Sequence, residues 1–321
     1  MLPRLRVLVS SAGAPGTYAL IKNLEAVEER PIEVVACDAE DFSLLYSYSK
    51  FVRVPPANDP DYAHVVTSLI EAMDIDVFLP VSTYEVPVVA QHAFPCHVVV
   101  SSFESIDLAL HKKRLYDVLV DYAPHRIYDI FPDSTDYILK SKAAKGGRGI
   151  FMVTANIQKR IHAAVNHKAQ DMQYIDPYEG YILWSTGKFL ACERLTGPHY
   201  DCMVLALDGD PLLVTCKTRE RTRWGVITYG ELINKPPLVE ICKKVTRTLG
   251  LSYNFGIQFI GNTVIDVNPR VSTFIYGPDF NEPYLAIKLA LGELTPDEVR
   301  AYQDKIPLGR KFIRYMDQVE H

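Results

Sequence analysis

The chain has 321 residues, of which 48% are hydrophobic and 23% charged, a composition typical of a folded protein of enzyme size. Its formal net charge of −5 provides no overall attraction to nucleic acid or to an anionic membrane, so neither is expected as a partner. No apolar run approaches the roughly 20 residues that a membrane helix needs, and the first residues resemble a strand, not a signal peptide. We therefore expect a cytoplasmic protein.

The cysteines and histidines give no sign of a metal or disulfide framework. The six cysteines are scattered without a Cys-x-x-Cys pair, and the nine histidines lack the spacing of metal ligands. We expect buried thiols in a reducing compartment and no zinc chemistry.

The first hundred residues alternate between apolar strands and amphipathic helices. Strands are expected at 6–10, 32–37, 77–79 and 98–101, and helices follow Gly16 and span 62–73. This alternation favours a parallel sheet with helices on both faces, a Rossmann-like unit.

A short glycine-containing segment, Gly13–Gly16, follows the first strand and opens a helix, and Asp38 ends the second strand. This is the setting of a dinucleotide loop, but the spacing is not that of the G-x-G-x-x-G fingerprint. Two interpretations remain open. One is nicotinamide binding; the other, which we favour, is a turn that brings a helix N-terminus to an anionic substrate.

A second glycine-rich segment lies between strands expected at 137–140 and 150–153, after a helix expected over 105–122. Consecutive glycines let backbone N–H groups approach phosphate oxygens, and Lys145 and Arg148 add positive charge. Lys140, in the first strand of this hairpin, is placed to reach an α- or β-phosphate. It is not a Walker loop, because no helix follows directly and the Gly-Lys-Ser/Thr order is absent. The other interpretation is an ordinary hairpin turn.

The second half of the chain is expected to be rich in antiparallel strands. These are predicted at 190–195, 201–207, 212–216, 254–260 and 263–267, with helices at 157–165 and 237–249 and a mostly helical end from 284. Residues two apart in a strand share a face, so Asp266 and Asn268 point the same way, and Gln258 can lie opposite on the partner strand. These hard oxygen donors suit Mg²⁺, and Arg270 follows to neutralise phosphate charge. The alternative is a solvated strand end.

Taken in chain order, these segments resemble the ATP-grasp ligases, in particular the single-chain group similar to the carbamoyl phosphate synthetase large chain and the pyrrolysine-biosynthesis ligase. The motifs that carry the resemblance are 79–85, 111–115, 138–149, 192–197, 200–209, 217–219 with Gly225, and 258–270. The chain departs from the family pattern in three places: Asp266 replaces the usual Glu, His111 replaces an Asp, and His199 replaces an acidic residue.

The resemblance implies an α/β and α+β chain with the ATP-grasp fold. It implies a Rossmann-like region at 1–105, an antiparallel subdomain with the glycine-rich loop at 106–192, and a second antiparallel subdomain with the metal site at 193–321.

The same resemblance implies an ADP-forming carboxylate–amine ligase that acts on a small carboxylate or amino acid through an acyl phosphate. The implied ATP-binding residues are Lys112, Lys140, Lys145, Gly146, Gly147, Arg148, Gly149, Glu193, Arg194 and Leu195. Arg270, Arg219 and Lys140 are implied as catalytic, and Gln258, Asp266 and Asn268 as ligands of Mg²⁺, with Mn²⁺ as an alternative metal.

Three other functions stay open: a regulatory protein with a degenerate ATP site, a bicarbonate-activating enzyme similar to carbamoyl phosphate synthetase, and a nicotinamide oxidoreductase. Residues 168–188 form a longer connection than the family has, and are either ordinary packing or a substrate lid. Tyr276, Asp279 and Asn281 are candidate pocket residues. The partners expected are a small carboxylate and an amine, and a homodimer is the base-rate assembly.

Overall fold

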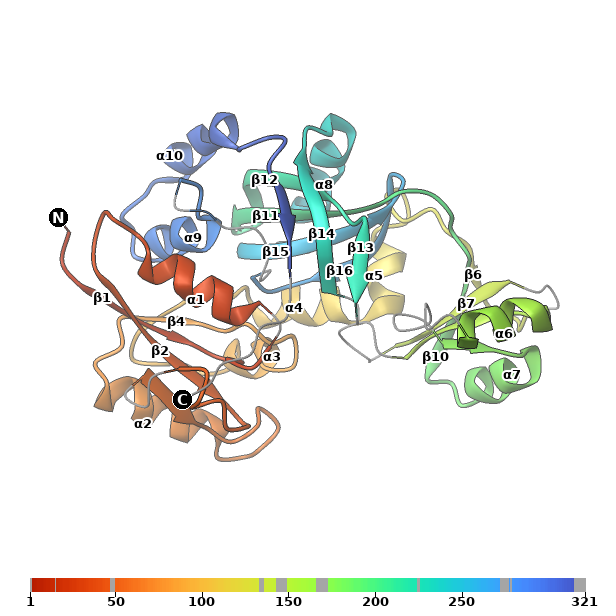
Figure 1. The fold of residues 1–321 in the computed structure, drawn as a ribbon, viewed down its shortest axis with the longest axis horizontal. Coiled ribbons are helices and arrows are strands. Elements are labelled where there is room, and N and C mark those ends of the chain that lie inside the picture. Colours follow the sequence, from red (N-terminus) through yellow and green to blue (C-terminus); the bar gives the residue numbers. More distant parts are fainter. Residues whose placement is uncertain are drawn as a thin grey trace.

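The computed structural model describes residues 2–14, 16–46, 50–132, 136–142, 149–165, 173–223, 226–271, 277 and 279–314. The strands of this part form three sheets, and the largest of them lies between the other two (Figure 1).

The first sheet is parallel throughout, as the alternation of strands and helices predicts. Its strands, in spatial order, are β3 (Phe51–Arg53), β2 (Ile32–Asp38), β1 (Leu5–Val9), β4 (Val77–Leu79) and β5 (His97–Val98). Helices α1 (Thr17–Glu25), α2 (Tyr62–Ala72) and α3 (Val86–Val89) accompany them. Val7 and Val9 belong to the same apolar core as Leu20 of α1, whereas Leu8 packs with Val66 of α2 on the opposite face. Burial on both faces explains why these strands are continuous apolar runs.

The second sheet forms a lobe at one end of the molecule (Figure 1). Its spatial order is β6 (Ile127–Tyr128), β10 (Phe189–Glu193), β7 (Tyr137–Ser141), β8 (Ile150–Val153) and β9 (Gln173–Ile175), with helices α6 (Ile157–Val165) and α7 (Pro177–Ser185). The predicted antiparallel pairing of β7 with β8 is present. Of the glycine-rich loop between them, Lys145, Gly146, Gly147 and Arg148 lie outside the described residues, and Gly149 is its described end, with φ of 66°.

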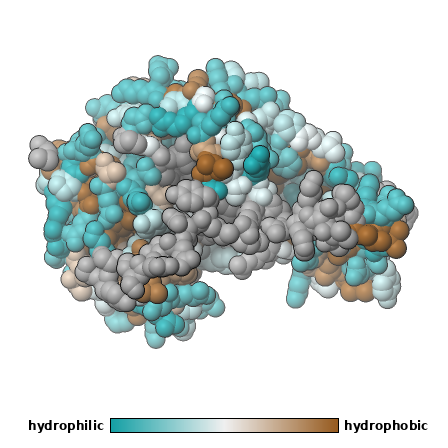
Figure 2. Space-filling model, viewed as in Figure 1, coloured by the Kyte–Doolittle hydropathy of each residue, from teal (hydrophilic) through white to brown (hydrophobic). Residues whose placement is uncertain are grey.

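The segment predicted as a long connection at 168–188 contains, within its described part, strand β9 and helix α7. A capping box fixes the start of α7: the Asp176 carboxylate accepts from the Glu179 backbone N–H, and the Glu179 carboxylate accepts from that of Asp176. The apolar residues of α7 are not confined to one side of the helix, so no apolar stripe marks it as a helix in the sequence. Tyr178 and Tyr181 are 73% and 51% exposed. Figure 2 shows hydrophobic surface at this end of the molecule.

The third sheet has seven strands and is antiparallel. Its path is β13 (Arg221–Arg223), β14 (Val226–Ile233), β12 (Asp210–Thr218), β11 (His199–Leu207), β15 (Tyr253–Ile260) and β16 (Thr263–Asn268), and β17 (Lys311–Ile313) pairs with β14. The sequence did not predict β13, β14 and β17.

Helices cover both faces of the third sheet. One face packs against α8 (Pro236–Leu249), α4 (Phe103–Leu110) and α5 (Lys112–Val118), with Cys202, Val204 and Cys242 in that core. On the other face, Leu205 and Leu213 share a core with α9 (Glu282–Ala290). Helix α10 (Pro296–Arg300) and the 3-10 helix η3 (Ala301–Lys305) follow α9. The predicted parallel-sheet region and the antiparallel third sheet are confirmed. The second sheet differs from the prediction because it is mixed: β8 and β9 pair in parallel, and its other pairs are antiparallel.

The single helix predicted over 105–122 is wrong: two helices, α4 and α5, meet at His111. His111 has extended backbone (φ −86°, ψ 90°), and its Nδ1 accepts a hydrogen bond from the Arg114 N–H at 3.4 Å. It therefore acts as the N-cap of α5, which a count of apolar periodicity does not detect.

All six cysteines lie in the described part of the chain and are free. Within the same part, no helix has both the length and the apolar character required to cross a membrane.

Candidate active site

A row of polar side chains crosses four neighbouring strands of the third sheet. Lys217 of β12 lies opposite Asp201 of β11, Asp201 opposite Gln258 of β15, and Gln258 opposite Asp266 of β16. Directly opposed residues of antiparallel strands share a face, so the four form one row, which we call the charged row. Asn268, two residues after Asp266, lies on the same face. The structure thus brings the three predicted metal ligands together.

The predicted ligands suit a hard cation that also binds phosphate. Gln258, Asp266 and Asn268 are partly exposed, and all offer oxygen donors. Among the described residues, no group of three His, Cys, Asp or Glu side chains is arranged to hold a metal. The set has a single carboxylate, so it fits Mg²⁺ whose remaining ligands are nucleotide phosphates and water.

Lys112, the first residue of α5, reaches this strand. Its Nζ lies 2.7 Å from Oδ1 of Asp266, and the two side chains are 12% and 29% exposed. Burial opposes the charged form of Lys112, but the Asp266 carboxylate outweighs it, and the pKa of Lys112 is raised. Lys112 is therefore a permanent positive charge at the predicted metal site.

Lys140 of β7 approaches the same strand from the second sheet. Its Nζ donates to the Tyr116 hydroxyl at 3.1 Å and to the Ile265 carbonyl at 3.5 Å, and the Tyr116 hydroxyl donates to that carbonyl at 2.8 Å. Tyr116 is a site residue that the sequence did not predict. Its position four residues after Lys112, on the same side of α5, was the available signal.

His125, between α5 and β6, lies beside this cluster and was also missed. It is 7% exposed, its ring meets that of Tyr116 edge-on at 4.4 Å, and neither ring nitrogen has a hydrogen-bond partner among the described residues. Burial and then the charge of Lys140 lower the pKa of His125 to about 4, so the imidazole is neutral at physiological pH. No motif or spacing in the sequence marks this residue.

The predicted adenine-binding segment ends β10. The Glu193 N–H donates to the Arg126 carbonyl at 2.8 Å, and the Glu193 carboxylate accepts from the Arg126 N–H at 3.1 Å. Arg194 lies 3.5 Å from the carboxylate of Asp136, and Leu195 is half-buried. The contact of these residues with adenine stays a prediction.

The two predicted arginines occupy different settings. Arg219 follows β12, is half-buried, and donates its backbone N–H to the His199 carbonyl at 3.0 Å. Arg270 follows β16, and its Nε donates to the Thr83 hydroxyl at 2.9 Å. Thr83 belongs to the loop after β4, so Arg270 joins the third sheet to the first.

A buried ionic cluster continues the charged row. Nζ of Lys217 lies 3.8 Å from Oδ2 of Asp201, with side-chain exposures of 2% and 11%. Nearby, Glu282 at the start of α9 accepts a hydrogen bond from the Thr215 hydroxyl at 2.9 Å. Burial lowers the pKa of Lys217 and raises that of Glu282 to about 7. Charged residues inside otherwise apolar strands were the signal for this cluster.

Replacing Glu282 with glutamine is expected to change how stability depends on pH. Below pH 4.5 the carboxyl is protonated in both folded and unfolded chains and has no effect; as pH rises toward about 7 only the unfolded chain ionises, which destabilises the fold. Glutamine cannot ionise and keeps an acceptor for Thr215. The variant should therefore gain about 3 kcal/mol over the wild type between pH 4.5 and 7, measured by urea unfolding. A constant difference across this range would contradict the assignment.

The Gly13 loop is organised by side chains of the chain itself. The Gly13 N–H donates to Oδ2 of Asp38 at 2.9 Å, and a Cβ at Gly13 would lie 2.0 Å from the ring of Phe42. Packing against Phe42 thus explains the glycine, and a protein carboxylate occupies the donor that an anionic ligand would use.

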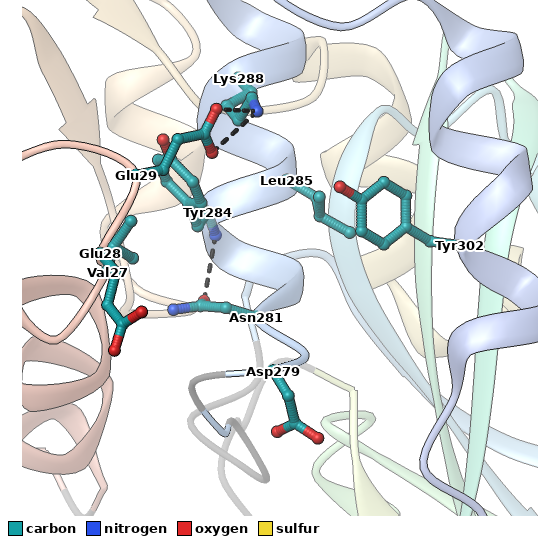
Figure 3. Close-up of a pocket in the computed structure, with 9 residues that line it drawn as sticks. All are labelled: Val27, Glu28, Glu29, Asp279, Asn281, Tyr284, Leu285, Lys288 and Tyr302. Carbon is teal, nitrogen blue, oxygen red and sulfur yellow. Dashed lines mark hydrogen bonds and ion pairs between the residues drawn. The ribbon is translucent and has the colours of Figure 1, made fainter. Parts of the chain in front are cut away.

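A separate pocket of about 410 Å³ lies between the end of α1 and α9 (Figure 3). It is lined by Val27, Glu28, Glu29, Asp279, Asn281, Tyr284, Leu285, Lys288 and Tyr302. It contains two of the three predicted pocket residues, Asp279 and Asn281, while Tyr276 lies outside the described residues. Glu29 pairs with Lys288 at 2.7 Å. None of the predicted nucleotide or metal residues lines this pocket.

Neither the protein-family models nor the curated proteins include a match to this sequence. Solved structures do match. Biotin carboxylase from Campylobacter jejuni, in complex with β,γ-ATP, is 15% identical over 92% of this chain and 72% of its own, with a TM-score of 0.60. An L-amino acid ligase from Bacillus licheniformis is 15% identical over 96% and 78%, with a TM-score of 0.63. N5-carboxyaminoimidazole synthetase from Staphylococcus aureus, with ADP, is 12% identical over 88% and 77%, with a TM-score of 0.56.

These likenesses cover between 88% and 96% of the chain. The chain therefore has the ATP-grasp fold, and the resemblance that its motifs predict is confirmed at the level of the fold. The finer resemblance to the carbamoyl phosphate synthetase large chain and the pyrrolysine-biosynthesis ligase stays a prediction.

Proposed function

We propose that this chain is an ADP-forming ligase that joins a small carboxylate to an amine through an acyl phosphate. The observation that carries the proposal is the meeting of two lysines at one strand. Lys112 from α5 and Lys140 from the second sheet both reach β16, where Asp266 stands in the charged row. Two cations and a carboxylate that meet at one strand from a helix and two different sheets suit the phosphates of a nucleotide with its metal.

In this proposal the chain's residues bind and orient ATP. Lys112 and Lys140 hold phosphate oxygens, and the segment Glu193–Leu195 binds adenine. The Gly146–Gly149 loop would close over the γ-phosphate and exclude water, which otherwise hydrolyses the acyl phosphate. Gln258, Asp266 and Asn268 would hold Mg²⁺, which supplies neutralisation of phosphate charge when bound.

Arg219 and Arg270 stabilise the negative charge that develops on the transferred phosphoryl group. A carboxylate oxygen of the substrate attacks the γ-phosphorus, and the bond from that phosphorus to the bridging oxygen of ADP breaks. The amine nitrogen then attacks the acyl carbon, phosphate leaves, and the amine loses a proton to give the amide. Orientation and charge neutralisation are sufficient for both steps, without a covalent enzyme intermediate.

The names of the similar structures support this reaction class and indicate two kinds of carboxylate. One is an L-amino acid ligase, and another is a biotin carboxylase domain crystallised with MgADP and bicarbonate. We propose an amino acid or small organic acid as the carboxylate, and bicarbonate is the second candidate. We also propose subdomain boundaries near residues 105 and 193, ahead of the first strand of the second sheet at Ile127 and of the third sheet at His199.

The proposal is tested by a screen for ADP release. Purified protein with Mg-ATP is supplied with single amino acids, small organic acids or bicarbonate, each with and without an added amine. We expect ADP release that requires Mg²⁺ and one class of carboxylate. Tight Mg-ATP binding without release under any condition would instead support a regulatory protein, and stabilisation by NADPH but not by ATP would support an oxidoreductase.

A further inference from the structure

The guanidinium of Arg270 is fixed from two sides. Nε donates to the hydroxyl of Thr83 at 2.9 Å, and Nη1 donates to the carbonyl of Val271 at 2.8 Å. Thr83 is 7% exposed, so the first of these bonds is shielded from water. Two hydrogen bonds at different nitrogens define the plane of the guanidinium, which a single contact would leave free to rotate.

Hydrogen bonds within the loop that carries Thr83 hold its backbone in place. The Tyr84 N–H donates to the Ser82 hydroxyl at 3.1 Å, and the Glu85 N–H donates to the Ser82 carbonyl at 3.1 Å. These bonds close a turn between β4 and α3, with Thr83 inside it. The backbone at Thr83 is therefore held by bonds that do not involve Arg270.

A buried carboxyl anchors this turn to the first sheet. Glu85 is 5% exposed and accepts hydrogen bonds from the hydroxyls of Ser10, at the end of β1, and Tyr62, at the start of α2. The Ser10 hydroxyl also accepts from the Val81 N–H at 3.2 Å. Burial raises the pKa of Glu85. Fully satisfied buried networks of this kind rigidify the segment that they join.

The turn that carries Thr83 also lies where the strand order of the first sheet reverses. In the strand order β3-β2-β1-β4-β5, the chain proceeds outward from β1 in one direction and then from β4 in the other. Ligands of open parallel sheets bind at the carboxyl ends of the strands where the order reverses, and both Ser10 and Thr83 follow those ends. Arg270 thus meets the first sheet at the carboxyl ends of its strands.

We infer that Thr83 is the positioning residue of Arg270, and that the first sheet, through Thr83 and the Glu85 anchor, sets the orientation of the arginine for phosphoryl transfer. This inference rests on the proposed function. A guanidinium that stabilises charge appearing only in the transition state must be held before the reaction, because reorganising it then would raise the barrier. Thr83 need not touch the substrate to have this effect.

The test compares Thr83→Val, which removes the hydroxyl at nearly constant volume, with Thr83→Ser, which keeps it. Each protein is titrated by calorimetry with Mg-ADP alone and with Mg-ADP plus aluminium fluoride, which mimics the phosphoryl group in transfer. We expect Thr83→Val to weaken the aluminium fluoride complex about tenfold while its affinity for Mg-ADP stays within about twofold of wild type. Thr83→Ser should match wild type in both titrations.

Equal binding of the aluminium fluoride complex by Thr83→Val and wild type would overturn the inference while leaving the proposed function standing. An equal loss for Mg-ADP and for the mimic would also overturn it, because it would indicate general disruption of the site. Failure of wild type to bind Mg-ADP would overturn the proposed function itself.

Hydrogen exchange at the Arg270 and Val271 amides tests the link between Thr83 and Arg270 alone. The exchange rate should rise in Thr83→Val but not in Thr83→Ser, and no rise would contradict the link.

Discussion

Asp266→Ala is expected to lower Mg-dependent ADP release by about 10³-fold or more, because it removes the only carboxylate among the three predicted metal ligands. The same change deprives Lys112 of the partner that lies 2.7 Å away, leaving a largely buried ammonium beside an apolar side chain. ADP release should be followed at saturating Mg-ATP with the carboxylate found in the screen.

Asp266→Glu is the matched control for this substitution. Glutamate is usual at this position in the ligases that the motifs resemble, and it keeps the charge on a side chain one methylene longer, so we expect most of the activity to be kept. Circular dichroism and thermal unfolding establish that both variants are folded. A folded Asp266→Ala protein with undiminished, Mg-dependent turnover would remove Asp266 from the mechanism.

Lys140→Ala is expected to lower ADP release by about 10²–10³-fold, the usual cost of losing a charge-assisted donor that stabilises a transition state. Lys140 is half-buried, and its Nζ already lies at the junction of the second and third sheets, 3.1 Å from the Tyr116 hydroxyl. The affinity for Mg-ATP, measured by calorimetry, should fall in the same variant, because the lysine binds phosphate in the ground state as well.

Tyr116→Phe distinguishes the role of Lys140 from that of its neighbour Tyr116. This variant removes the hydroxyl to which Lys140 donates but keeps the lysine and the ring that packs on His125. We expect a loss of no more than about tenfold. If Tyr116→Phe were as damaging as Lys140→Ala, the role of Lys140 would be to hold the two sheets together and not to bind phosphate.

The convergence of Lys112 and Asp266 has a consequence for nucleotide binding. In the structure Lys112 neutralises the Asp266 carboxylate that the proposed function assigns to Mg²⁺. Binding of Mg-ATP therefore has to exchange this ion pair for a carboxylate–metal contact and a lysine–phosphate contact. The exchange keeps both charges compensated, which limits its cost in a half-buried site.

The sequence predicted the elements whose signal is local. The runs at β1, β2 and β4 are apolar because both faces of the first sheet are buried, and the alternation at β15 and β16 placed Gln258, Asp266 and Asn268 on one face. It failed where the signal is weak or unusual. Helix α7 has no single apolar stripe, and β14 contains a glycine and a glutamate among its apolar residues.

Several site residues were beyond prediction because contacts between distant segments define them. Thr83 gains its role from Arg270, 187 positions later. For Tyr116 the spacing from Lys112 was a signal, but its contact with the Ile265 carbonyl, 149 positions later, was not foreseeable. The pairing of Asp201 with Lys217 was also beyond prediction. The Asp208-Gly209 turn, which sets Leu207 opposite Asp210, would place Asp201 opposite Cys216, but an irregularity between Leu205 and Ala206 shifts the register by one residue. His125 shows no pattern at all in the sequence.

The central claim is that this chain binds ATP through a metal held at Asp266, and a calorimetric titration with a non-hydrolysable ATP analogue tests it most directly. With Mg²⁺ present, wild type should bind one equivalent of the analogue, and chelation of Mg²⁺ or Asp266→Ala should weaken that binding at least about tenfold. Asp266→Glu should bind as wild type does. Absence of binding by wild type at millimolar analogue, or binding of equal strength with and without Mg²⁺, would contradict the account.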